Sequence, residues 1–259
     1  MIVDEVNKSY VRDLMKSGKR PDGRGMYDYR KAVIQTGYIP NAEGSALVSL
    51  GDTKVLAGVK LDMVAPFPDR PGEAVISFNA EFSPIAHPDF EAGPPNENSI
   101  ELARVVDRGI RSAEAINLKE IGKNKTAEGK VLGIYVDLYI LDQCGNLIDC
   151  AALAAMAALC TTQMPRIEGE KLVRQDFTGP LPLTRRVIAC SFETIEGKAI
   201  LDASYQEEVA SDGRMTVSIT DDGKVCAGQK SGAAGFTREQ LMEFTDIAFE
   251  KGAAHFEQL

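Results

Sequence analysis

The chain has 259 residues, 44% of them hydrophobic, and a formal net charge of −9. This size allows one large domain or two small ones, and the acidic balance argues against a broad nucleic-acid-binding surface, so any contact with a polyanion must be local. The two histidines exclude a histidine-rich metal site, and no apolar run approaches the ~18 residues that cross a bilayer.

The N-terminal segment, residues 1–17, is expected to carry an amphipathic helix over residues 3–17 that ends at Ser17-Gly18. Early acidic residues and the lack of a continuous apolar stretch argue against a secretory signal. The five cysteines are odd in number and include no CxxC pair. They predict reduced side chains, buried at Cys150 and Cys160, and a cytoplasmic protein.

Four strands are predicted next. The preceding KRPDGRG is expected to be a turn held by Asp22, with Gly23 at positive φ. Short turn signals separate the first strand from the second (PNAEG) and the second from the third (GDT). The four runs therefore predict an antiparallel meander, over residues 31–39, 45–51, 54–63 and 74–82.

The loop AHPDFEAGPPNEN leads to a helix predicted over residues 98–117, with Asn98 as its cap and Glu101 as the reciprocal partner. At about 100° per residue, three arginines fall within about 60° of one another. An apolar face lies opposite them, made of Leu102, Val106, Ile110 and Ala113. The arginines form what we call the basic stripe, Arg104, Arg108 and Arg111.

The basic stripe has two explanations. Glu101 precedes Arg104 by three residues, Asp107 precedes Arg111 by four, and Glu114 follows Arg111 by three. Such pairs contribute about 0.2–0.5 kcal/mol each and describe an ordinary salt-bridged surface helix. The alternative is phosphate binding, because the guanidinium group presents a bidentate fork to phosphate oxygens.

The rest of the chain again alternates predicted strands with predicted helices. A strand is predicted over residues 131–142, followed by the turn QCGN and a helix over residues 150–164 that is apolar on every side and must be buried. A last helix runs from Thr237 to about His255 and begins at a TREQ capping box. Four further strands lie between these helices, over residues 185–193, 198–206, 215–221 and 224–230.

Strands followed by helices, twice over, predict an α+β fold. The two similar halves are expected at about residues 18–165 and 166–259. No linker or low-complexity tract separates them, so we expect a single domain over residues 1–259.

The order and spacing of four stretches resemble the RNase PH family: RPDGRGMYDYR (20–30), EGSALVSLGDTKVLAGV (43–59), ELARVVDRGIRSA (101–113) and VDLYILDQCGN (136–146). The resemblance implies an RNase PH-like fold, of the kind also seen in ribosomal protein S5 domain 2. The N-terminal helix and the HPDFEAGPPNEN loop are most similar to the second RNase PH-like subunit of the archaeal exosome, the paralogue paired with the catalytic one.

The family's reaction is phosphorolysis, in which inorganic phosphate attacks the last phosphodiester of an RNA 3′ end. Holding free phosphate requires backbone amides, a hydroxyl and a cation. At the family's phosphate loop this chain has Gly145-Asn146, followed by Leu147 and Ile148 in place of the hydroxyl and the arginine. Neither side chain donates a hydrogen bond, and Asp149 adds a negative charge, so phosphate is not expected to bind.

Two aspartates of active members, six residues apart, align with Glu208 and Arg214. An arginine neither coordinates a divalent metal nor accepts a proton. Asp212 offers an alternative through a shift of register, because an even offset on a strand keeps the same face. Otherwise Asp202, Glu207 and Glu208 are expected to form a solvated acidic edge, with no metal and no cofactor.

The resemblance therefore implies a non-catalytic subunit of the archaeal exosome, a phosphate-dependent 3′→5′ exoribonuclease. Its implied partners are the catalytic RNase PH-type subunit, in a ring of three alternating heterodimers, together with RNA and RNA-binding cap subunits, and no membrane. Arg104, Arg108 and Arg111 would bind RNA. Two alternatives stay open, a self-sufficient phosphorolytic exoribonuclease and a scaffold without RNA contact.

Overall fold

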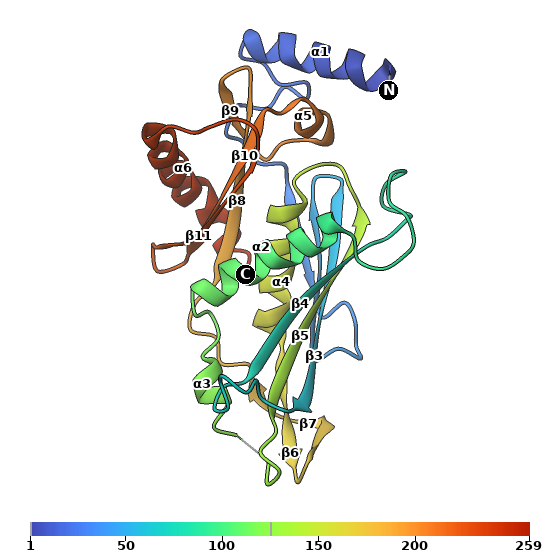
Figure 1. Ribbon diagram of the computed structural model, residues 1–259, viewed down its shortest axis with the longest axis vertical. Coiled ribbons are helices and arrows are strands. Elements are labelled where there is room, and N and C mark those ends of the chain that lie inside the picture. Colours follow the sequence, from blue (N-terminus) through green and yellow to red (C-terminus); the bar gives the residue numbers. More distant parts are fainter. Residues whose placement is uncertain (1, 125) are drawn as a thin grey trace.

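The computed structural model describes residues 2–124 and 126–259, so Met1 of the predicted N-terminal segment lies outside the described residues. Figure 1 shows an elongated molecule in which two sheets lie on either side of a central helix. No helix among the described residues is long and apolar enough to span a bilayer.

The first sheet has five strands in the order β1-β2-β3-β5-β4. The strands are β1 (Ala32–Thr36), β2 (Gly44–Leu50), β3 (Thr53–Val64), β4 (Val75–Phe82) and β5 (Val131–Asp142). The predicted strand over 131–142 is confirmed to the residue. β1, β2 and β3 form the expected antiparallel hairpins, and β3 pairs antiparallel with β5.

The predicted meander is wrong at its fourth strand. β4 does not pair with β3; it pairs parallel with β5, which lies between them. The connection from β3 to β4, APFPDRPGEA, contains three prolines and is too long for a tight turn. The chain then returns from β4 to β5 through a helix, the crossover that a parallel pair requires.

The second sheet is antiparallel, in the order β11-β10-β8-β9. Its strands are β8 (Val187–Ile195), β9 (Lys198–Leu201), β10 (Gly213–Thr220) and β11 (Val225–Gly232). A separate hairpin of β6 (Gln163–Glu168) and β7 (Lys171–Pro180) was not predicted. The predicted strand over 198–206 is wrong beyond Leu201, because Tyr205–Ala210 form a short helix.

Six helices are described: α1 (Ile2–Lys16), α2 (Glu97–Ser112), α3 (Leu118–Ile121), α4 (Leu147–Thr161), α5 (Tyr205–Ala210) and α6 (Arg238–Phe256). The TREQ capping box of α6 is confirmed, since the Thr237 hydroxyl and the Gln240 side chain each accept a backbone N–H. The helix α4 begins three residues before its predicted start and is buried along most of its length, as expected.

The helix α2 differs from its prediction at both ends. Its cap is Asn96 rather than Asn98, because the Asn96 side chain accepts the N–H of Ser99 at 2.9 Å. Its last turn ends at Ser112 rather than at 117. Glu114 adopts a left-handed conformation with φ 50°, which turns the chain out of the helix.

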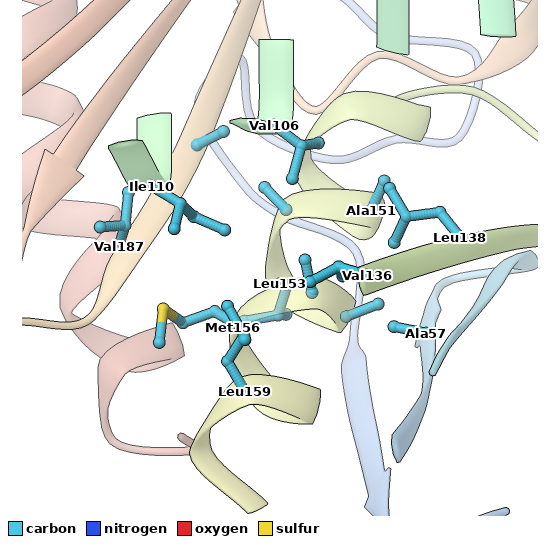
Figure 2. Close-up of a cluster of buried hydrophobic side chains, with 14 of the residues drawn as sticks. Ala57, Val106, Ile110, Val136, Leu138, Ala151, Leu153, Met156, Leu159 and Val187 are labelled. Atoms are coloured by element: carbon cyan, nitrogen blue, oxygen red, sulfur yellow. The ribbon is translucent and has the colours of Figure 1, made fainter. Parts of the chain in front are cut away.

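The core is centred on α4, which is packed between the two sheets and beneath α2. Figure 2 shows Ile110 of α2 beside Val187 at the start of β8, Met156 and Leu159 of α4 below them, and Val136 and Leu138 of β5 on the other side of α4. A smaller apolar cluster holds α1 against the second sheet, made of Val11, Met15, Ile195, Ile200, Ala203 and Ala210. The division into similar halves at about residue 165 stays a prediction.

Candidate functional site

The turn that enters α4, where the family's phosphate loop would lie, is fixed from several sides. Gly145 has φ 99°, and a Cβ there would lie 2.4 Å from the Ala203 carbonyl oxygen, so the position requires glycine. The Gly145 carbonyl accepts the Thr53 hydroxyl at 2.6 Å and Nη2 of Arg30 at 3.0 Å. The position of this turn is therefore set by both sheets.

The backbone N–H of Asn146 in this turn is already hydrogen-bonded to a carboxylate. The N–H of Asn146 donates to Oε1 of Glu208, in α5, at 2.8 Å. Leu147 is the first residue of α4 and Ile148 is buried, so neither supplies a hydroxyl or a cation. Burial raises the pKa of Glu208, although the Asn146 amide and the Arg214 guanidinium oppose that shift. The structure thus brings Glu208 to the turn, where it occupies the amide that an incoming anion would need.

Asp149 lies beside this turn, as expected, but its carboxylate is buried inside the fold. It is buried in the first turn of α4 and accepts hydrogen bonds from the Tyr29 hydroxyl, the Asn146 side chain and the Ser191 N–H at 2.9–3.0 Å. Burial raises the pKa of Asp149 to about 6, even though Asn146 and Ser191 favour the charged form. Its role is to tie α4 to the second sheet.

The predicted solvated acidic edge is wrong. The side chains of Asp202 and Glu207 are fully buried, and Glu208 is enclosed beside α4. Arg20 donates to both carboxylate oxygens of Glu207 at 2.8 Å. It also donates to the carbonyls of residues 201 and 202. A bidentate, fully desolvated pair therefore joins the RPDGRGMYDYR motif to α5.

The DGR turn has the predicted form. Gly23 has φ 77°, and Asp22 accepts the N–H of Arg24 at 3.1 Å. Beyond that turn, Arg24 and Arg30 both bind Asp202, at 2.9 and 2.7 Å. Burial opposes the charge of Asp202, yet the bonds from Arg30 hold its pKa below its usual value. Sequence reasoning assigned no role to Arg20 or Arg30, although both lie in the RPDGRGMYDYR motif.

The register-shift alternative for Asp212 is wrong. Asp212 lies just before β10 rather than on the strand that carries Arg214, so the even-offset argument does not apply. Asp212 instead accepts a bond from Arg12 of α1. Arg214 lies on β10 opposite Glu193 of β8, with Nη1 3.8 Å from the Glu193 carboxylate. The second aligned position thus holds a guanidinium, whose partner Glu193 was not anticipated from the sequence.

Replacing Glu193 with glutamine is expected to stabilise the chain at pH 8. Burial raises the pKa of Glu193 to about 7 from an ordinary value of 4.5, despite the Ser211 hydroxyl bond and the nearby Arg214. A carboxyl with a raised pKa contributes stability below pH 4.5 that is lost as the pH rises through 7. The glutamine amide carries no charge to bury at pH 8. The substitution is therefore expected to raise the free energy of unfolding by up to about 3 kcal/mol at that pH.

Urea unfolding of wild type and Glu193→Gln at pH 5 and pH 8 tests this expectation. The gain at pH 8 must shrink at pH 5, where the wild-type carboxyl is largely protonated. An equal effect of the substitution at both pH values would contradict it.

The basic stripe lies on the exposed face of α2, opposite the buried Leu102, Val106, Ile110 and Ala113, as predicted. Of the three expected salt bridges only Asp107–Arg111 forms, at 2.7 Å, and Arg111 also donates to the Ile76 carbonyl. Arg108 donates to the Gln229 side chain on β11. Arg104 has no ion pair or hydrogen bond with any residue in 2–124 or 126–259. The three arginines therefore differ: Arg104 makes no bond within the described residues, whereas Arg111 is held by Asp107 and by the Ile76 carbonyl.

No group of three or more His, Cys, Asp or Glu side chains within the described part of the chain is arranged to hold a metal ion. The acids around α4 are instead engaged with arginine, serine and amide donors. All five cysteines are free thiols, and Cys150 and Cys190 are buried. The predicted burial of Cys160 is wrong, because its side chain at the end of α4 is only half-buried.

Comparisons with known proteins match the chain along most of its length. Two models of the 3′ exoribonuclease family match, domain 1 over residues 28–165 and domain 2 over residues 185–251. The exosome complex component Rrp42 of Methanothermobacter thermautotrophicus is 41% identical over 254 residues, 96% of this chain and 93% of that protein. A chain of the Archaeoglobus fulgidus exosome with RNA bound to the active site superposes with a TM-score of 0.90 at 39% identity, covering 100% and 99% of the two chains. A chain of an archaeal exosome core gives 0.85 at 37% identity, covering 99% and 97%.

Proposed function

Because this chain belongs to the 3′ exoribonuclease (RNase PH) family, we propose that it is a non-catalytic component of an exosome of the archaeal type. In this role it structures the active site of a catalytic RNase PH-type partner and helps to bind RNA, in a ring of alternating subunits that also carries RNA-binding caps. The free thiols of all five cysteines support the cytoplasm as its compartment.

The absence of catalysis by the chain itself is argued mainly from Glu208. Its carboxylate takes the Asn146 amide at 2.8 Å, and its negative charge repels a phosphate dianion from the same place. Leu147 and Ile148 offer neither hydroxyl nor cation in compensation. The second aligned position holds Arg214, which neither binds a metal nor accepts a proton.

The basic stripe supports the role in RNA binding. Arg104 is exposed and unengaged within the described residues, and Arg108 is held by one neutral partner, Gln229. Both guanidinium groups are one helical turn apart, so they are spaced to meet neighbouring phosphates. Arg111 is tied to Asp107 and Ile76 and is expected to contribute less.

Two rival functions make different demands on these residues. A self-sufficient phosphorolytic enzyme requires that phosphate displace Glu208 from the Asn146 amide. A scaffold without RNA contact requires that the stripe pair only with acids or with the partner, and among the described residues a single such ion pair forms, Asp107–Arg111. The geometry therefore favours the RNA-binding, non-catalytic role.

The purified chain is expected not to release nucleoside diphosphates from an RNA 3′ tail at any phosphate concentration up to about 10 mM, because the phosphate position is filled. Adding the RNase PH-type paralogue from the same genome is expected to yield a hetero-oligomer and phosphate-dependent release. Light scattering and chromatography of the products measure both.

The control is a paralogue carrying a substitution of its own catalytic acid, which must abolish activity of the mixture. Phosphorolysis by the isolated chain that Glu208→Ala removes would support the self-sufficient enzyme. A stable monomer that ignores the paralogue would reject assembly.

A further inference from the structure

The outer face of the first sheet ends in an acidic groove beside β4. The groove has a volume of about 390 Å³ and lies between the end of β4 and the loop over residues 91–96. Its lining includes the carboxylates of Glu81, Glu91 and Asp137 and no lysine, arginine or histidine. A pocket with three carboxylates and no resident cation is electrostatically complementary to a cationic group.

The floor of the groove adds an aromatic surface to these charges. Tyr139 is 40% exposed and lies opposite Glu81 in the β4–β5 register. Asp137 accepts a bond from Asn79 at 3.1 Å, which holds its carboxylate on the same face. Partial burial, then Asp137 and Glu81, raise the pKa of Tyr139, so both charges act on the phenol ring. A guanidinium stacked on this ring would meet both carboxylates.

The edge of β4 next to the groove is unpaired. β4 is the last strand of its sheet and pairs only with β5. The Ile76 carbonyl accepts Arg111 and the Ala74 N–H donates to Leu118, so the even-numbered residues direct their backbone groups away from β5. Further along the strand, the outward groups of Phe78 and Ala80 make no hydrogen bond with described residues outside the sheet.

An unpaired edge of this kind is a template for an added strand. Side chains of an added strand lie about 5 Å from those of β4 on the same face, within reach of Glu81. The edge and the groove therefore specify one occupant, an extended segment that carries a positive charge.

We propose that the groove and the β4 edge dock an extended, cationic segment of the ring's partner subunit, which places an arginine or lysine side chain between Glu81, Glu91 and Tyr139. This inference rests on the proposed function, because it assigns the partner's chemistry and its place on this chain. RNA is excluded as the occupant, since its phosphates would meet three carboxylates.

The groove variant Glu81→Gln/Glu91→Gln removes two charges and leaves the Asn79–Asp137 bond intact. The matched control Glu239→Gln/Glu250→Gln removes two exposed charges from α6. In a first arm, an acetylated Arg-Val-Arg-Val-Arg peptide is titrated onto each chain, with binding followed by NMR. We expect wild type and control to bind alike and the groove variant to bind at least 10-fold more weakly. No binding to wild type, or equal binding by the groove variant, overturns the proposal.

In a second arm, each chain is mixed with the RNase PH-type paralogue and the dissociation constant of the hetero-oligomer is measured at 0.1 and 0.5 M salt. The groove variant is expected to assemble at least 10-fold more weakly at low salt, with a smaller salt dependence. Assembly equal to wild type overturns the docking proposal and leaves the proposed function standing. Peptide binding without any assembly of the wild type rejects the proposed function and leaves the chemistry of the groove standing.

Discussion

Replacing Arg20 with alanine is expected to lower the free energy of unfolding by about 3–5 kcal/mol, which is a large part of the stability of an ordinary domain. Arg20 and Glu207 form a bidentate pair whose side chains are both fully buried. The substitution leaves the Glu207 carboxylate desolvated, without its bidentate partner and with only Arg24 nearby, at 4.0 Å. It also removes the donors to the carbonyls of residues 201 and 202.

Urea unfolding monitored by circular dichroism measures this loss, and three variants serve as controls. Lys54→Ala removes an exposed pair with Asp142 and is expected to cost less than about 1 kcal/mol. Arg20→Met/Glu207→Met removes both charges together and is expected to recover much of the loss. Arg20→Lys keeps the charge without the fork and should fall between wild type and alanine. A cost of Arg20→Ala as small as that of Lys54→Ala would contradict the burial of this pair.

The double variant Arg104→Ala/Arg108→Ala is expected to leave the ring intact, weaken its binding to single-stranded RNA roughly 10- to 100-fold and slow degradation by the partner's active site. Each lost phosphate contact removes about 0.7 from the slope of log affinity against log salt. The slope should therefore flatten by roughly one to two units. Fluorescence anisotropy from 50 to 300 mM salt provides both quantities.

A matched control separates contact from overall charge. Arg166→Ala/Arg238→Ala removes two positive charges from exposed positions outside α2 and is expected to leave the salt slope unchanged. Assembly must first be verified by sizing at the assay salt, because under the proposed function the same arginines can also pair with acids across the interface with the partner. If the ring is intact and both affinity and slope of the double variant equal those of wild type, the stripe is a solvated face and the chain acts as a scaffold.

Elements whose signals are local in the chain were predictable before the fold was known. The apolar runs of β5 and α4 fixed a strand and a buried helix, because each pattern is complete within about fifteen residues. The capping box of α6 and the Gly23 turn were predictable for the same reason. The exposed side of α2, and with it the basic stripe, followed from 3.6-residue periodicity.

Strand pairing, in contrast, depends on contacts between segments that are far apart in the chain. Nothing in the sequence of β4 distinguishes an antiparallel partner in β3 from a parallel one in β5, because both choices bury the same face. The hairpin of β6 and β7 was not predicted, because polar residues interrupt the alternation of apolar and polar side chains along its strands. The acidic groove exists only because β5 is inserted beside β4, which brings Asp137 and Tyr139 next to Glu81.

In the candidate site, too, some features were predictable from the sequence and others depend on contacts between distant segments. From the sequence, Leu147, Ile148 and Arg214 already lacked the groups that hold phosphate or metal, because that judgement needs only side-chain chemistry. The burial of Asp202 and Glu207 was not predictable, since their arginine partners lie more than 170 residues earlier in the chain. A charged residue is expected at the surface unless an oppositely charged partner is buried together with it. Only the folded chain brings that partner into contact.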